Sequence, residues 1–225
     1  MTPILFICSD ELNRDYLGCS GNEVIQTPNL DALARRGTRF TAAYTPSPIC
    51  GPARTSLATG LHVHQHEMWD SAAPYDGSIP SWGHRLRDAG YKVASVGKLH
   101  YRSSADDNGF DEEHLATHAT DGVGWIRGLL RSEPAILTEA CAAYARDVGP
   151  GESSYVDYDR TITKRACRWI RDTADADRPW ALFVSFMAPH FPLIAPSDFY
   201  DRYSPAELAE AAGYDPSQCP DHPVI

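Results

Sequence analysis

Short, largely apolar runs alternate along the chain with longer segments whose apolar residues recur at helical spacing. The runs at 3–8, 91–96 and 179–186 are rich in β-branched or aromatic residues, which is typical of strands buried in a parallel sheet. Amphipathic segments separate these runs. The alternation predicts an α/β fold with a mostly parallel sheet flanked by helices.

The segment at 27–37 carries the sequence signals of a complete helix. Thr27 suits an N-cap, Pro28 the first turn and Gly37 the end. Leu30 and Leu33 share one face, which we expect to pack in the core. Similar signals predict a strand at 39–44 and further helices at 78–90, 134–145 and 155–174.

Length, composition and net charge limit the classes of protein to which the chain can belong. With 225 residues and 43% apolar composition, the chain can bury a sizeable core. A net charge of −10 argues against a nucleic-acid binder, although local cations can still bind an anionic substrate. Six scattered cysteines without a CxxC pair fit reduced thiols, and we find neither a signal peptide nor a membrane span. We therefore expect a cytoplasmic protein with no membrane partner.

The segment from Cys50 to Gly60 combines a nucleophile with a helix start. Gly51-Pro52 suits a turn into a helix, so Cys50 would face the free N–H groups and the positive end of that helix. Arg54, one turn later, adds a planar cationic fork for an oxyanion. The structural alternative is a small buried cysteine.

Asp10 and Glu11 directly follow the first apolar run. Open α/β sheets place ligands at the carboxyl ends of their strands, and two adjacent carboxylates suit a hard cation such as Ca²⁺ or Mg²⁺. A solvated loop or a helix cap is the alternative interpretation.

Lys98, His100 and His190 follow the two later runs. Lys98 and His100 are two residues apart, so in an extended chain their side chains point the same way. A lysine can stabilise charge on a sulfuryl or phosphoryl oxygen, and an imidazole can transfer protons near neutral pH. A solvated lysine and structural histidines are the alternatives.

Three histidines at 62, 64 and 66 raise the question of zinc. On a strand, these imidazoles would share one face. No cysteine or acid at the usual zinc spacing supports such a site, so substrate contact or a structural role is the favoured interpretation.

The Cys50–Gly60 segment resembles the signature of the type I sulfatases, Cys-x-Pro-Ser/Ala-Arg followed by Leu-x-Thr-Gly. The order of motifs is also similar, with an acidic pair, a Thr-Pro-Asn-Leu-Asp helix, the Cys motif, Gly-Lys-x-His and Pro-His-x-Pro. Leu61 stands where the family commonly has Arg or Lys. Glu11 departs in identity at the second acidic position.

The resemblance implies an alkaline-phosphatase-like fold and hydrolysis of a small-molecule sulfate ester. In the family, a formylglycine-generating or sulfatase-maturating enzyme oxidises the motif cysteine, here Cys50, to formylglycine. Asp10, Glu11 and residue 50 would then bind a divalent metal, with Ca²⁺ as the family expectation. The resemblance further implies a catalytic role for Arg54, sulfate binding by Lys98 and His190, and proton transfer by His100.

The resemblance extends over nearly the whole chain but only the first half of a typical sulfatase domain. The resemblance therefore implies that residues 1–225 are the N-terminal portion of one catalytic domain, truncated before the later Asp-His-Gly-like metal segment. Three alternatives stay open: a phosphonate or phosphate ester hydrolase of the same superfamily, a non-catalytic fragment, and a thiol phosphatase. The last is disfavoured because only three residues separate Cys50 from Arg54.

Overall fold

The computed structural model describes residues 1–124, 146–174 and 177–208. The chain divides into two compact units. Residues 1–12 and 40–195 belong to the first, and residues 13–39 belong to the second with the described residues from 196 onward. The helix expected at 134–145 lies outside the described residues.

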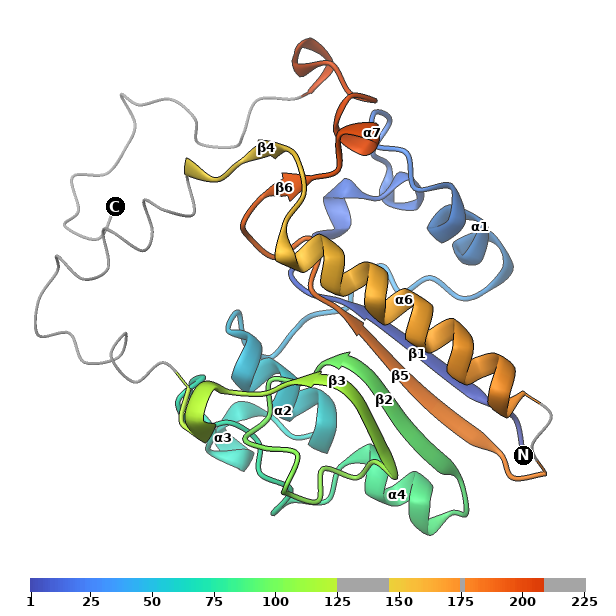
Figure 1. Cartoon of the computed structure of the whole chain (residues 1–225), viewed down its shortest axis with the longest axis vertical. Helices are drawn as coiled ribbons and strands as arrows, with labels where there is room; N and C mark the ends of the chain where they lie inside the picture. Colours follow the sequence, from blue (N-terminus) through green and yellow to red (C-terminus); the bar gives the residue numbers. More distant parts are fainter. Residues whose placement is uncertain (125–145, 175–176, 209–225) are drawn as a thin grey trace, which may run out of the picture. The chain divides into compact units, whose positions relative to one another are not determined.

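A four-stranded sheet forms the centre of the first unit (Figure 1). Its spatial order is β1-β5-β2-β3, and every neighbouring pair is parallel. The expected α/β fold with a parallel sheet is therefore confirmed. The strands are β1 (Ile4–Ser9), β2 (Lys92–Lys98), β3 (Glu112–Thr117) and β5 (Trp180–Phe186).

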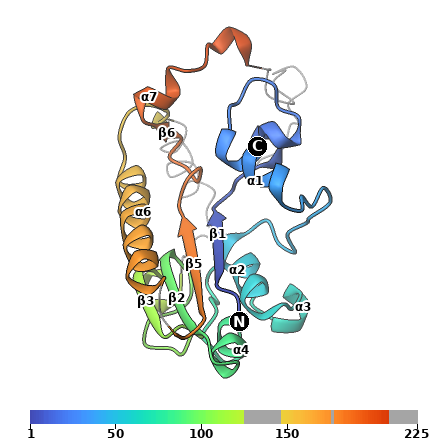
Figure 2. The same cartoon turned by 90° about the vertical axis from the view of Figure 1, so that its right-hand side faces the viewer.

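Helices cover both faces of this sheet. In Figure 2, α6 (Ser154–Thr173) lies on one side, and α2 (Cys50–Thr59) and α4 (Trp82–Asp88) lie on the other. The shorter elements of the unit are α3 (Val63–His66), the 3-10 turn η3 (Thr120–Gly122), and the paired β4 (Gly149–Pro150) and β6 (Ile194–Ala195).

The side chains of β5 pack alternately on the two faces of the sheet. Leu182 and Val184 pack with Ile162 of α6, whereas Phe183 packs with Ala58 of α2. Successive residues of a strand point to opposite faces, so an uninterrupted apolar run is what a sheet covered on both sides requires.

β1 is paired less completely than its sequence predicts. It pairs with β5 among the described residues, and Ile4, Leu5 and Ile7 are 39%, 46% and 58% exposed. The expectation of a strand at this position is confirmed, but the expectation that it is buried is wrong. An apolar run predicts burial only where a neighbour covers it, and β1 lies at an edge of the described sheet.

The second unit is built from short helices. They are the α-helices α1 (Pro28–Arg36) and α7 (Ser197–Tyr200) and the 3-10 turns η1 (Arg14–Tyr16), η2 (Gly18–Ser20) and η5 (Pro205–Glu207). Helix α1 begins and ends as expected. Leu30 and Leu33 are nevertheless 45% and 59% exposed, so the prediction that they pack in a core is wrong. Spacing identified their common face but not whether anything covers it.

The segment at 39–44 differs from its predicted secondary structure. Residues 39–44 are irregular, and Phe40 and Tyr44 are 80% and 90% exposed, so the strand expected there does not form. A strand needs a neighbour for its backbone hydrogen bonds, whatever its intrinsic preference.

Within the described ranges, no helix has both the length and the apolarity to cross a bilayer.

Candidate active site

The predicted site residues lie at the carboxyl ends of three parallel strands. Asp10 follows β1, Lys98 ends β2, and His190 lies four residues beyond β5. Because β1, β5 and β2 are adjacent and parallel, these ends meet at one edge of the sheet. The edge is where open α/β sheets bind ligands.

Asp10 is the centre of a buried ionic cluster. One carboxylate oxygen accepts from Lys98 Nζ, and the other accepts from Arg54 Nη2 at 3.1 Å. Burial alone would raise the pKa of Asp10, but the hydrogen bond from Lys98 and the charges of Arg54 and Lys98 lower that pKa below 3.8. The carboxylate is therefore ionised and held by two cations.

Arg54 connects the helix that begins at Cys50 to the sheet. Its Nη1 donates to the carbonyl of Lys98 at 2.6 Å and to Ser185 Oγ at 3.1 Å, while Nη2 binds Asp10. Both terminal nitrogens are thus occupied by protein groups. In this structure the guanidinium positions Asp10 and the end of β2, whereas the sequence suggested that it would clamp a free oxyanion.

Cys50 is the first residue of α2 and is half-buried. The start of this helix is closely packed, because a Cβ on Gly51 would lie 2.9 Å from Ser71 Cα. Pro52 is accommodated in the first turn, where its missing N–H removes no helical hydrogen bond. The thiol therefore lies at the positive end of a helix whose backbone is fixed.

The predicted site residues line two cavities. Cys50, Asp10, Glu11 and Arg54 line the larger, which has a volume of about 790 Å³. Lys98, His100 and His190 line the smaller, of about 400 Å³. The Asp10–Lys98 ion pair and a 3.6 Å contact between Glu11 Oε1 and His190 Nε2 join the residues of the two cavities.

The backbone between β2 and His100 is irregular and not extended as the sequence suggested. The β2–β3 register shifts between Val96 and Lys98, and Gly97 and His100 both have positive φ, 103° and 59°. A Cβ on Gly97 would lie 2.1 Å from the carbonyl oxygen of Ser185, so glycine is required there. Lys98 and His100 do line one cavity, but the extended chain assumed from the sequence is not the reason.

The environment of His100 keeps its ring neutral. Burial and the positive charges of Lys98 and Arg54 lower its pKa from 6.5 to about 4. Its Nδ1 is buried and has no hydrogen-bond partner among the described residues. The ring is therefore an uncharged proton acceptor on the cavity wall, and its low pKa makes it a weak base.

The residues predicted to bind a metal fit a hard cation in kind. Asp10 and Glu11 supply carboxylate oxygens on the cavity that also contains Cys50, and Glu11 is half-exposed there. Ca²⁺ takes about six to eight oxygens, more than these side chains supply. Within the described part of the chain, no three His, Cys, Asp or Glu side chains are grouped so that they could hold a metal ion.

The histidines at 62–66 do not form a strand face. Residues Val63–His66 form helix α3, His62 and His64 are exposed and stacked with a centroid distance of 5.7 Å, and His66 is buried. His66 Nδ1 accepts from the backbone N–H of Met68 at 3.1 Å, so Nε2 carries the proton and donates to Ser56 Oγ at 3.0 Å. The three imidazoles do not converge, and the zinc interpretation is wrong.

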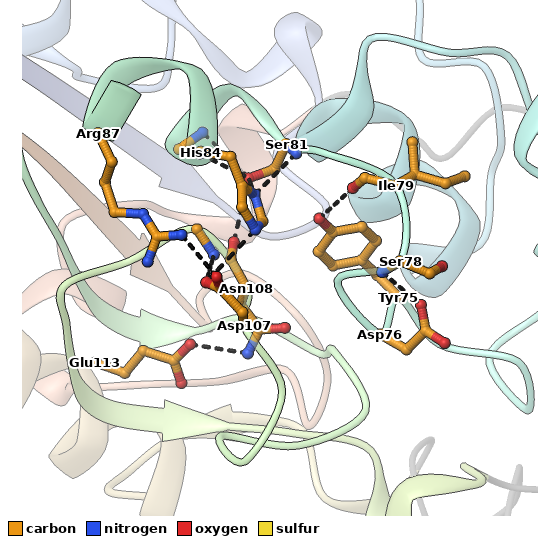
Figure 3. A network of polar contacts seen from close by, with 12 residues as sticks. Tyr75, Asp76, Ser78, Ile79, Ser81, His84, Arg87, Asp107, Asn108 and Glu113 are labelled. Atoms are coloured by element: carbon orange, nitrogen blue, oxygen red, sulfur yellow. Dashed lines mark hydrogen bonds and ion pairs between the residues drawn. The ribbon is translucent and has the colours of Figure 1, made fainter. Parts of the chain in front are cut away.

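A second polar constellation, which the sequence did not suggest, has a structural role. Ser81 Oγ lies 2.8 Å from His84 Nδ1, and His84 Nε2 lies 3.4 Å from Asp107 Oδ1. The three side chains are drawn together in Figure 3. The order resembles a nucleophile triad. Ser81, however, is 2% exposed and caps α4 by accepting from the backbone N–H groups of Gly83 and His84. Its hydroxyl is inaccessible to a substrate, and the network joins α4 to the loop before β3.

Sequence reasoning missed Ser185 as a member of the Asp10 cluster. The available signal was a single hydroxyl in the otherwise apolar run of β5, at a position that is fully buried. A buried hydroxyl needs a partner, and Arg54 is that partner.

Sequence comparison relates most of this chain to known proteins. The family model described as Sulfatase matches residues 3–214. The uncharacterized sulfatase YidJ of Escherichia coli K12 is 30% identical over 97% of this chain and 45% of its own length. A choline-sulfatase of Rhizobium meliloti is 32% identical over 91% of this chain and 41% of its own.

A solved structure shares the fold. The phosphonate monoester hydrolase of Agrobacterium radiobacter matches with a TM-score of 0.67 at 23% identity, over 94% of this chain and 46% of that one. The chain spans less than half the length of these relatives. Since the family model covers almost all of the sequence, the chain belongs to the sulfatase family.

Proposed function

We propose that the protein to which this chain belongs hydrolyses a sulfate monoester with a nucleophile derived from Cys50. The observation that carries the proposal is the position of Cys50 at the start of α2, on the same cavity as Asp10 and Arg54. Membership of the sulfatase family supports the sulfate ester as substrate.

The nucleophile requires a modification of Cys50. A separate maturation enzyme, which supplies the oxidant, would convert the thiol to the aldehyde of formylglycine, and water would add to give a geminal diol. One diol oxygen attacks the sulfur of the ester, the S–O bond to the alcohol breaks, and the alcohol leaves with a proton. A sulfate ester of residue 50 remains.

The residues around the cavities have distinct roles in this scheme. Lys98 donates to sulfate oxygens as charge moves onto them. His190, whose Nδ1 donates to the carbonyl of Phe191, donates to sulfate from Nε2 as an imidazolium, with both ring nitrogens protonated. His100, which is uncharged in the folded chain, takes the proton of the remaining hydroxyl as the C–O bond to sulfate breaks and the aldehyde re-forms. Arg54 acts through Asp10, whose carboxylate it holds at 3.1 Å.

Asp10, Glu11 and the oxygen of modified residue 50 would hold a divalent cation, for which Ca²⁺ is the expectation. Such a cation supplies Lewis-acid polarisation of the nucleophilic oxygen and of the ester. The chain itself orients the first ligand, because Lys98 and Arg54 fix both oxygens of Asp10.

Two alternatives make different predictions. A phosphonate or phosphate ester hydrolase would use the same nucleophile, and one neighbour in fold is a phosphonate monoester hydrolase. A non-catalytic fragment would bind neither metal nor substrate. This alternative is considered because the chain spans less than half the length of the two relatives.

The test compares an aryl sulfate with an aryl phosphonate on protein from the native source. We expect faster turnover of the sulfate and loss of activity in Cys50→Ala. Cys167→Ala, an exposed cysteine on α6, is the matched control and should change nothing. Calcium-dependent sulfatase turnover by Cys50→Ala would refute the proposal, and faster phosphonate turnover would favour the alternative ester.

A further inference from the structure

The first turns of α6 carry polar and aromatic residues that its packing on the sheet does not explain. Its apolar stripe, which includes Ile162 and Trp169, packs against β2 and β5. Tyr155 and Tyr158, nearer the helix start, line the 400 Å³ cavity with His100 and His190, and Tyr158 also packs against the core cluster. This end of α6 therefore contributes to the site as well as to the core.

Asp159 binds the chain that leaves β5. Its Oδ1 accepts from the backbone N–H of Met187 at 2.8 Å, and its Oδ2 accepts from the backbone N–H of Ala188 at 2.9 Å. β5 ends at Phe186, so these two amides lie beyond the strand and depend on a side chain for their bonds. One carboxylate thus holds two consecutive peptide units.

A backbone hydrogen bond links the first of these peptide units to His190. The His190 N–H donates to the carbonyl of Met187 at 2.9 Å, so the residue held by Asp159 also fixes the backbone of His190. His190 Nδ1 donates to the carbonyl of Phe191 at 2.7 Å, and its Nε2 lies 3.6 Å from Glu11.

Tyr155 fixes the ring of the same histidine. The two rings meet edge to face, with centroids 5.9 Å apart and an interplanar angle of 69°. Tyr155 and Asp159 are four residues apart on one helix, hence on the same face. One face of α6 therefore supports both the backbone and the ring of His190.

We propose that Asp159 is a positioning residue for His190, with Tyr155 as its second support. The role rests on the proposed function, in which His190 donates to the sulfate of the substrate. A misplacement of about 1 Å can cost about 100-fold in rate, so a group that fixes the histidine backbone matters although it never touches the substrate.

The test begins with geometry, which does not depend on turnover. In Asp159→Asn one of the two accepting oxygens is replaced by an NH₂ group, so one amide loses its partner. By NMR, the amides of Met187 and Ala188 and the imidazole of His190 should shift, and the two amides should exchange with solvent about tenfold faster. Asp157→Asn, on an exposed residue of the same helix turn, is the control and should leave these signals unchanged.

A second pair of variants addresses the ring. Tyr155→Leu removes the aromatic edge and should shift the His190 imidazole signals, whereas Tyr155→Phe keeps it and should restore them. Unchanged His190 signals in both Asp159→Asn and Tyr155→Leu would overturn the inference.

Kinetics then link the geometry to the site. With an aryl sulfate, Asp159→Asn should raise KM about tenfold, the effect of about one lost hydrogen bond. Added to His190→Ala, it should have no further effect. If His190→Ala raises KM and Asp159→Asn does not, the positioning role is refuted alone. If His190→Ala leaves KM unchanged, His190 does not bind sulfate, and the inference fails together with that part of the proposed function.

Discussion

Arg54 on α2 and Asp10 after β1 form a buried ion pair with an Nη2–Oδ1 distance of 3.1 Å, and their side chains are 6% and 9% exposed. The pair joins the helix that begins at Cys50 to the strand end that carries the predicted metal ligands. Lys98 from β2 binds the same carboxylate. The carboxylate of Asp10 therefore links the helix that begins at Cys50 to the ends of β1 and β2.

Asp10→Asn should strongly destabilise the fold. The substitution leaves two buried cations without a counter-charge, and breaking a buried pair costs about 3–5 kcal/mol. Chemical denaturation measures the loss. Asp172→Asn, which removes an exposed partner of Arg168 at 3.6 Å, is the control and should cost less than about 1 kcal/mol. Equal losses in the two variants would show that the cluster is not buried as described.

The same carboxylate predicts a loss of stability in acid. The pKa of Asp10 lies below 3.8 in the folded chain, so the folded state favours the ionised form. Above about pH 4 the carboxylate contributes its full stabilisation, which disappears as the pH falls through the folded pKa. In Lys98→Met, which removes the main cause of that low pKa, this acid dependence should become shallower. An unchanged profile would contradict the assignment.

Ser185→Ala should weaken the hold on Arg54. A hydrogen bond to a charged group is worth about 1.5–3 kcal/mol, and Ser185 Oγ accepts one from Arg54 Nη1 at 3.1 Å. Ser95 on β2 is the matched control. It is equally buried, and its hydroxyl has no partner in the part of the chain that the structure describes. Ser95→Ala should therefore cost clearly less in the same denaturation measurement.

His100 should stay neutral in the folded chain down to about pH 4. Because its folded pKa lies below the ordinary 6.5, the unfolded chain binds the proton first. Stability is unaffected above about pH 6.5 and falls as the pH drops toward 4, by at most about 3 kcal/mol. His100→Gln should abolish this part of the pH dependence. Titration of the His100 signal near pH 6.5 by NMR would contradict the account.

Ser56 should be unreactive although it lines the cavity of Cys50. His66 donates its Nε2 proton to Ser56 Oγ and so cannot take the hydroxyl proton as a base. A fluorophosphonate probe should not label Ser56, and Ser56→Ala should cost about 1 kcal/mol of stability, as for a neutral hydrogen bond. Labelling at Ser56 would mean that the opposite tautomer of His66 is present.

Much of the site could be predicted because its residues follow strands. The apolar runs predicted β1, β2 and β5, and parallel strands bring the residues after them to one edge, as with Asp10, Lys98 and His190. Resemblance to the sulfatases then attached a chemistry to Cys50, which residue type and spacing alone left undecided.

The rest depends on contacts that spacing does not encode. The partners of Arg54 come from three different strand ends, and β3 was not predicted at all because its sequence, Glu112–Thr117, is mixed in polarity. The His62–His66 segment has an alternating pattern that suits a strand, but Val63–His66 form a single helical turn that ends at Glu67 in the left-handed conformation. A local capping box between His62 and Gln65 supports the helix, and pairing with β2 supports β3; the alternation of apolar and polar residues reveals neither contact.

The most direct test is the mass of the tryptic peptide at 40–54, which contains Cys50, from protein isolated from its native source. The account predicts that an aldehyde replaces the thiol of Cys50 in this peptide. An unmodified thiol in protein that turns over a sulfate ester would contradict the proposed nucleophile.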